Sequence, residues 1–249
     1  MKKYCKCKLS AALALAFIIM AVLGTVSFAH AGGVITEKNV PRKTKSAKEA
    51  MVRIGDKILY SYGQWEQDGN FRKKSGCGYC AVASLCGLVK NKKVLPMTIC
   101  KANRSTGLGN YKNIAKALKK QGVRFQYFRS FGGRKASLLQ IRKCLQEHRP
   151  VIVTVTGRWS TGARHYLLLV GITDKGNVLV CDSARDRRWS GSMQRFKIVR
   201  WSGIAPYISK LSKSKKTDIC TNISQIDAGG KKVSGINRMG FIAAAAPAY

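Results

Sequence analysis

Acidic side chains are scarce in this chain: 11 Asp and Glu stand against 46 Lys and Arg in 249 residues, a formal net charge of +35. Proline is rare as well, and the glycines follow no three-residue period, which excludes a collagen-like repeat. Because 45% of the residues are hydrophobic, the composition also disfavours extended disorder and a short disulfide-stapled protein, and one globular domain fits the length best. The positive charge predicts attraction to phosphate-bearing partners such as nucleic acid, anionic lipid or wall polymers, without choosing among them.

Residues 1–31 have the pattern of an export signal. A start rich in Lys is followed by an apolar run over residues 11–23, and Ala29 and Ala31 supply the small-x-small pattern of a cleavage site. We therefore expect a secreted or cell-surface protein that begins near Gly32; an uncleaved membrane anchor is the alternative. Cleavage would remove four Lys and no acidic residue, which lowers the formal charge from +35 to +31.

The remaining chain is predicted to contain one folded domain between two basic segments. Residues 32–50 and 207–249 are rich in Lys and polar residues, so we expect a solvated linker at the first position and a linker with a C-terminal tail at the second. The domain is predicted over residues 51–206. Within the tail, residues 233–246 fit either an edge strand or a trailing chain.

The hydrophobic pattern of the domain predicts helices first and strands second. Residues 78–89 are apolar on nearly every side, which predicts a buried helix. A second helix is expected between Asn110 as its N-cap and Gly122 past its end, and a third over residues 136–147. Strands are predicted over residues 151–156, 165–172, 178–182 and 194–201. This order predicts an α+β fold, with helices packed against an antiparallel sheet.

Seven cysteines remain once the predicted signal is removed, and an odd number cannot pair completely within one chain. In an exported protein this indicates at least one free thiol or an intermolecular bridge. Burial is the simplest way to keep such a thiol reduced. The seven are Cys77, Cys80, Cys86, Cys100, Cys144, Cys181 and Cys220.

Cys77 is the candidate nucleophile, because it lies between two glycines at the start of the predicted buried helix. Unpaired backbone amides and the positive end of the helix dipole lower the pKa of a thiol at such a place. The flanking glycines, Gly76 and Gly78, permit a substrate to approach the backbone closely. A cysteine that is only packed at a helix start is the alternative.

A thiolate nucleophile needs a base, and two histidines remain outside the predicted signal. His148 is expected near the end of a helix, where a solvated histidine stabilised by the helix dipole is the better interpretation. His165 opens an apolar strand after a polar stretch, which makes it the candidate base. Asp182 ends the next strand of the same hairpin and is the candidate that orients His165.

The oxyanion formed on a substrate carbonyl needs hydrogen-bond donors. The backbone amide of Cys77 is one, and a side-chain amide from Gln64 or Gln67 is the other. Gln64 is preferred, since Gly63 precedes it and an aromatic residue that can wall a cleft follows it.

These segments together resemble papain-fold cysteine peptidases of the bacteriocin-processing type, family thirty-nine of the cysteine peptidases and its secreted relatives. The similar segments are Gly76-Cys77-Gly78, His165 before a Val-rich strand, and an apolar run that ends in Asp182. The resemblance spans about residues 60–201 and implies a papain-like fold and hydrolysis of peptide bonds, without metal or cofactor. It implies Cys77 as nucleophile, His165 as base, Asp182 as orienting residue and Gln64 as oxyanion donor. The chain departs from the family pattern at Tyr79 and Cys80, at Arg164, and at Ser183, which replaces the Pro after the Asp.

Three other functions remain open. Cys77 and Cys80 form a Cys-x-x-Cys sequence at a helix start, as in thiol-disulfide exchange proteins. A zinc site built on these cysteines lacks a second Cys-x-x-Cys or a paired His to complete it. The third alternative is a catalytically silent binder of polyanions; because the basic residues are dispersed, the sequence predicts no specific nucleic-acid module.

Overall fold

The computed structural model describes residues 34–42, 48–65, 67, 76–103, 107–128, 133–159, 165–184, 195–208 and 241–249. The predicted signal, residues 1–31, and Cys220 lie outside this part of the chain. No helix within these ranges is long and apolar enough to cross a membrane.

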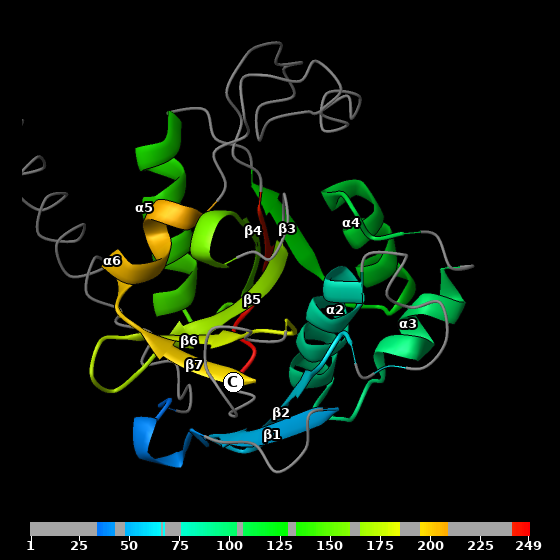
Figure 1. Ribbon diagram of the computed structural model, residues 1–249, viewed down its shortest axis with the longest axis horizontal. Helices are drawn as coiled ribbons and strands as arrows, with labels where there is room; N and C mark the ends of the chain where they lie inside the picture. Colours follow the sequence, from blue (N-terminus) through cyan, green and yellow to red (C-terminus); the bar gives the residue numbers. More distant parts are fainter. Residues whose placement is uncertain are drawn as a thin grey trace, which may run out of the picture. The chain divides into compact units, whose positions relative to one another are not determined.

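A six-stranded antiparallel sheet forms the centre of the described structure (Figure 1). In spatial order its strands are β3 (Phe125–Phe128), β8 (Phe241–Ala244), β4 (Val151–Val155), β5 (His165–Ile172), β6 (Val178–Cys181) and β7 (Phe196–Val199). The central strands are apolar along almost their whole length because both faces of the sheet are covered.

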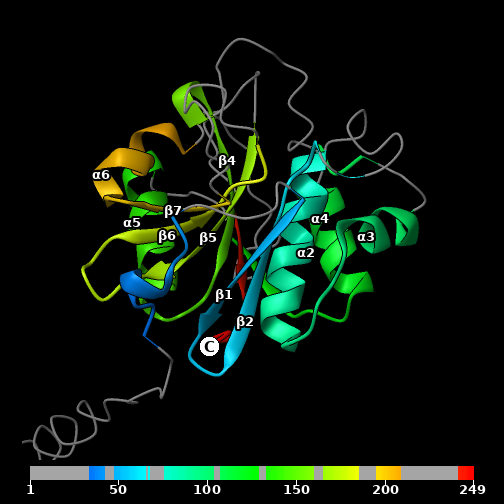
Figure 2. The same ribbon diagram turned by 60° about the horizontal axis from the view of Figure 1, so that its bottom comes forward.

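Helices cover the two faces of this sheet and make two hydrophobic cores. One face carries α2 (Gly76–Lys90), α3 (Pro96–Ala102) and α4 (Tyr111–Lys120), and the other carries α5 (Gly133–Gln146) and the short α6 (Trp201–Ile204). The hairpin of β1 (Glu49–Ile54) and β2 (Lys57–Tyr62) lies across α2 (Figure 2). Because hairpin, sheet and helices surround α2, nearly every residue from Gly76 to Leu88 is buried.

The predicted α+β architecture is confirmed, with the buried helix at α2 and the strands at β4 to β7. The side chain of Asn110 accepts a hydrogen bond from Asn113 N at 2.9 Å, as expected of the N-cap of α4. Gly122 has a φ of +65°, which suits its place after the helix end. The prediction missed β1, β2 and β3, which are short or only half-buried, and α3.

The prediction of a solvated linker over residues 32–50 is wrong for its described parts. Ile35 and Val40 are buried, and Ile35 bridges to Thr173 at the end of β5. Glu37 Oε1 accepts hydrogen bonds from Thr173 Oγ1 at 2.7 Å and from Asn177 Nδ2 at 2.8 Å. Ile35 and Val40 are buried on either side of Glu37, and the carboxylate of Glu37 accepts hydrogen bonds from the β5–β6 turn. These contacts hold the segment against the domain.

The prediction of a tail over residues 207–249 is wrong for the last nine residues. β8 lies inside the sheet and pairs with both β3 and β4, so it is not an edge strand. Tyr249 Oη donates to Val170 O at 3.2 Å, in a space that a side chain at Gly171 would fill. Residues 241–249 therefore belong to the domain, whose boundary extends beyond residue 206.

Candidate active site

Cys77 lies in the first turn of α2, with its side chain half-buried. The backbone of Leu108 approaches this turn so closely that a Cβ built on Gly78 would lie 2.8 Å from Leu108 O and 2.7 Å from Leu108 Cβ. Only glycine fits at position 78. The close contact fixes the segment around Leu108 against the helix start that carries Cys77.

The ring of His165 connects Cys77 to Asp182. Its Nε2 lies 2.8 Å from Asp182 Oδ1, and the ring also hydrogen-bonds with the Cys77 side chain. Because the carboxylate accepts the Nε2 hydrogen, Nδ1 is the nitrogen left to exchange a proton with the thiol. The contact with Asp182 is possible because β5 and β6 pair antiparallel, with Leu168 opposite Cys181.

The pKa values of these groups favour an ion pair between sulfur and imidazole. Burial alone raises the pKa of Cys77, but the hydrogen bond and charge of His165 outweigh it, aided by the backbone amides of Tyr166 and Gly78, so this pKa lies below its ordinary value. Burial lowers the pKa of His165, yet hydrogen bonds and charges from Asp182 and Cys77 raise it to about 10. For Asp182 burial is likewise outweighed, by His165 and by Lys197, so its pKa is well below the ordinary range.

Gln64 joins the same network from the end of β2. Its backbone N donates to Ser183 O at 2.9 Å, and its Oε1 accepts a hydrogen bond from Ser183 Oγ at 3.2 Å. Ser183 directly follows Asp182, so the structure brings all four predicted site residues into one connected set. Gln67 is placed differently: its Nε2 donates to Gly63 O at 3.0 Å and so supports the backbone.

His148 does not reach this site, and the expectation that it is solvated is wrong. It lies half-buried in the turn after α5, with a φ of +54°, and its ring packs edge-on against Tyr249 at 5.1 Å between ring centroids. The sequence did not predict that the C-terminal residues fold back to cover it.

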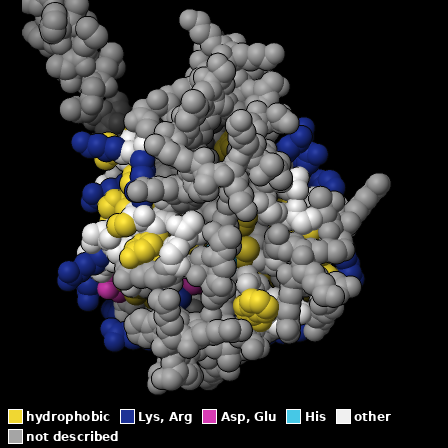
Figure 3. Space-filling model, turned by 45° about the horizontal axis from the view of Figure 1, so that its top comes forward, with side chains coloured by type: hydrophobic (Ala, Val, Ile, Leu, Met, Phe, Trp, Pro, Cys, Tyr) yellow, Lys and Arg dark blue, Asp and Glu magenta, His cyan; other side chains and the backbone are white. Residues whose placement is uncertain are grey.

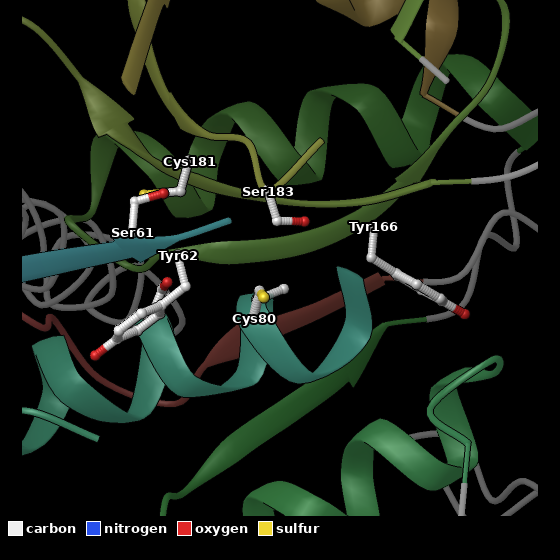
Figure 4. Close-up of a pocket in the computed structure, with 8 residues that line it drawn as sticks. Ser61, Tyr62, Cys80, Tyr166, Cys181 and Ser183 are labelled. Carbon is white, nitrogen blue, oxygen red and sulfur yellow. The ribbon is translucent and has the colours of Figure 1, made fainter. Parts of the chain in front are cut away.

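A small pocket lies beside the site, between β2, α2 and the ends of β5 and β6 (Figure 4). Hydroxyl and thiol groups line it: Ser61, Tyr62, Cys80, Ser84, Tyr166, Cys181 and Ser183. Cys80 is 2% exposed, and its side chain faces this pocket. The two cysteines of the Cys-x-x-Cys sequence thus have different surroundings.

The six cysteines of the described ranges, Cys77 among them, carry thiol groups. Within the described ranges, no three His, Cys, Asp or Glu side chains gather in a way that would hold a metal ion. Burial raises the pKa of Cys86 to about 12 and that of Cys181 well above its ordinary value, whereas the pKa of Cys77 is lowered. Of these three thiols, Cys77 is the one whose pKa is shifted toward the thiolate form.

Two groups in this network were not predicted from the sequence. Lys197 Nζ lies 2.8 Å from Asp182 Oδ2, and the backbone N of Ala184 donates to Asp182 Oδ1 at 2.9 Å. In a chain with 46 Lys and Arg, one Lys on a predicted strand gives no signal by itself.

Comparison with known proteins decides the family. The profile of the Peptidase_C39 like family matches residues 58–208. The chain belongs to this family. Its helices and antiparallel sheet are the papain-like fold of C39 peptidases, with α2 as the central buried helix.

A solved structure found by the comparison is the peptidase domain of Streptococcus ComA, described as a bi-functional ABC transporter involved in a quorum sensing pathway. The identity is 15% and the TM-score 0.38, over 57% of this chain and 88% of that one. No curated protein matches the sequence significantly. Family and fold support a cysteine peptidase-like function for this member of the C39-like family.

Proposed function

We propose that this chain is an exported cysteine peptidase that hydrolyses peptide bonds through Cys77, His165 and Asp182, with Gln64 as an oxyanion donor. The observation that carries the proposal is the position of the His165 ring, which hydrogen-bonds with the thiol of Cys77 on one side and with Asp182 on the other. The family supports a peptide or protein substrate.

The reaction begins with attack of the Cys77 thiolate on the substrate carbonyl carbon. The carbonyl oxygen becomes an oxyanion that accepts hydrogen bonds from the backbone N–H of Cys77 and from Gln64 Nε2. Ser183 holds the amide oxygen of Gln64, which leaves the NH₂ group of Gln64 to donate to the oxyanion.

His165 then moves the protons of both half-reactions. Its imidazolium gives the Nδ1 proton to the departing amine, and the C–N bond breaks to leave an acyl-thioester on Cys77. The neutral ring next accepts a proton from water, whose oxygen attacks the thioester and releases the acid. Asp182 stays ionised throughout and holds the Nε2 hydrogen.

The test compares wild type, Cys77→Ala and Cys80→Ala on a peptide library. Wild type and Cys80→Ala should cleave the same peptides, and Cys77→Ala should lose activity by at least about 1,000-fold, because the nucleophile is absent. Cleavage that persists without Cys77 would contradict the proposal. Loss on Cys80→Ala together with disulfide reduction by wild type would favour thiol-disulfide exchange instead.

We also propose that the basic surface keeps the exported enzyme near anionic lipid or wall polymers. Lys and Arg side chains line both sides of the described surface in Figure 3, and acidic side chains are few. The exposed face of α4 carries four Lys side chains, and α4 contains no acidic residue. This face consists of Lys112, Lys116, Lys119 and Lys120.

Sedimentation with vesicles of phosphatidylglycerol, compared with vesicles of neutral lipid, tests whether the basic surface binds anionic lipid. Changing the four Lys of α4 to Gln should weaken binding to anionic vesicles several-fold more than a control variant with the same charge change at dispersed sites. The control changes Lys92, Lys135, Lys143 and Lys175 to Gln. Equal losses in both variants would show that total charge, and not the α4 face, determines binding.

A further inference from the structure

Asp182 is held from two sides, and only one of them is the histidine. Oδ1 accepts from His165 Nε2 at 2.8 Å and from Ala184 N at 2.9 Å, while Oδ2 accepts from Lys197 Nζ at 2.8 Å. The Asp182 side chain is 4% exposed. A buried carboxylate without donors on both oxygens would be strongly destabilised, and Lys197 supplies the donor to Oδ2.

The fold directs Lys197 to this position. β7 pairs antiparallel with β6, and Lys197 lies opposite Val180, close to the end of β6 where Asp182 follows. Its side chain is 17% exposed, and Nζ lies 5.4 Å from the centre of the Trp159 ring, a cation–π contact. The indole in turn is fixed by a hydrogen bond from Trp159 Nε1 to Gly203 O at 3.2 Å.

We propose that Lys197 is a positioning residue of this site: it fixes the Asp182 carboxylate so that Oδ1 stays directed at His165, and its charge limits how strongly Asp182 stabilises the imidazolium. The inference rests on the proposed function, because it assigns a role within the same Cys77, His165 and Asp182 set. In the proposed enzyme, four charged groups therefore follow one another. They are the thiolate of Cys77, the imidazolium of His165, the carboxylate of Asp182 and the ammonium of Lys197.

The charged groups around the Asp182 carboxylate determine whether replacing Lys197 raises or lowers the pH at which His165 loses its proton. His165 on β5 and Lys197 on β7 both face Asp182, and Arg195 donates to Asp182 O at 3.4 Å from the chain just before β7. Cys181 at the end of β6 is a neutral neighbour, because burial raises its pKa. The charged groups that interact directly with His165 are the carboxylate of Asp182 and the thiolate of Cys77. The ammonium of Lys197 repels the positive charge of His165, so its removal should raise the pH at which His165 loses its proton.

Alkylation of Cys77 by iodoacetamide as a function of pH tests the proposal without a known peptide substrate. In the full chain, peptide mapping follows Cys77 alone. A thiolate–imidazolium pair gives a rate profile with two steps, the lower from Cys77 and the upper from His165. Lys197→Met should move the upper step to higher pH by up to about one unit, and Lys197→Arg should keep the wild-type profile.

Lys197→Gln separates the two parts of the role, because its amide still donates to Oδ2 but carries no charge. It should move the upper step as Lys197→Met does, while peptide hydrolysis falls less than in Lys197→Met, where the carboxylate is free to turn. The Lys197→Gln variant also keeps the proposal testable if Lys197→Met does not fold. Lys92→Met, which neutralises an exposed Lys just after α2, is the matched control and should change neither property.

The outcomes are distinct. A wild-type profile without two steps would overturn the proposed ion pair and with it the proposed function. A two-step wild-type profile whose upper step stays in place or moves to lower pH in folded Lys197→Met and Lys197→Gln would overturn the role of Lys197 alone. A Lys197→Arg variant that behaves like Lys197→Met would do the same.

Discussion

Ser183 Oγ donates a hydrogen bond to Gln64 Oε1 at 3.2 Å, and Gln64 N donates to Ser183 O at 2.9 Å. This double contact joins the end of β2 to the residue that follows Asp182. An unbroken set of contacts therefore runs from Gln64 through Ser183, Asp182 and His165 to Cys77. Because the amide oxygen of Gln64 is occupied, the orientation of its NH₂ group is fixed before substrate binds.

Ser183→Ala should lower kcat by about 3- to 30-fold with little change in KM, since the oxyanion donor loses its orientation but is still present. Complete removal of such a donor typically costs about 100- to 1,000-fold. Ser183→Thr keeps the hydroxyl and should retain most activity. Steady-state kinetics on one peptide substrate measure the effect; a loss that appears only in KM, or that Thr does not restore, would argue against this role.

The rate of peptide hydrolysis should be flat around neutral pH and fall above pH of about 10, where His165 loses its proton. It should fall again in acid, where the thiolate of Cys77, whose pKa lies below its ordinary value, becomes protonated. The pH dependence of kcat/KM measures both limbs. An alkaline limb near the ordinary histidine pKa of about 6.5 would contradict the ion pair.

The same groups predict how stability depends on pH. The pKa of His165 is raised, so its contribution to the free energy of unfolding is present below the ordinary histidine pKa and is lost as pH rises to about 10. The stability difference between wild type and His165→Gln should therefore narrow over this range. Urea denaturation at several pH values measures it, and a difference that widens with pH would contradict the shift. Asp182 has the opposite pH dependence. Because its pKa is lowered, its contribution to the free energy of unfolding is present at neutral pH and is lost as the pH falls into the acid range.

Gly78→Ala should destabilise the domain by about 1–3 kcal/mol, because the new Cβ would overlap the backbone of Leu108. The intrinsic preference of a helix for Ala over Gly, about 1 kcal/mol, acts in the opposite direction and does not compensate. Lys116→Ala on the exposed face of α4 is the control and should stay within about 0.5 kcal/mol of wild type. A Gly78→Ala variant as stable as the control would show that the segment around Leu108 yields easily.

Ile242→Ala should cost about 2–5 kcal/mol, because Ile242 is fully buried in β8 between β3 and β4. Leu139→Ala is the control, since Leu139 is 60% exposed. Chemical denaturation compares the two. Equal stability of both variants would mean that the C-terminal strand contributes little to the domain.

The sequence predicted those elements whose pattern is decided locally. The apolar residues of α2, the Asn110 cap and the alternation of strands with turns each give a signal within a few residues. The pairing of His165 with Asp182 was also predictable, because the two lie in one hairpin. The position of β8 was not predictable, because Phe241–Ala244 is short. Its place between β3 and β4 depends on contacts with residues about 90 positions away in the sequence. Lys197 was missed for a similar reason: only the register of β7 on β6 distinguishes it from the many exposed Lys.

The central claim is that His165 keeps Cys77 as a thiolate, and limiting iodoacetamide at neutral pH tests it most directly. In the wild-type chain Cys77 should be alkylated before the other thiols, and His165→Ala should remove this preference, because the pKa of Cys77 then returns toward its ordinary value. Lys116→Ala should leave the order unchanged. A Cys77 that reacts no faster than the other thiols in wild type, or equally fast without His165, would contradict the account.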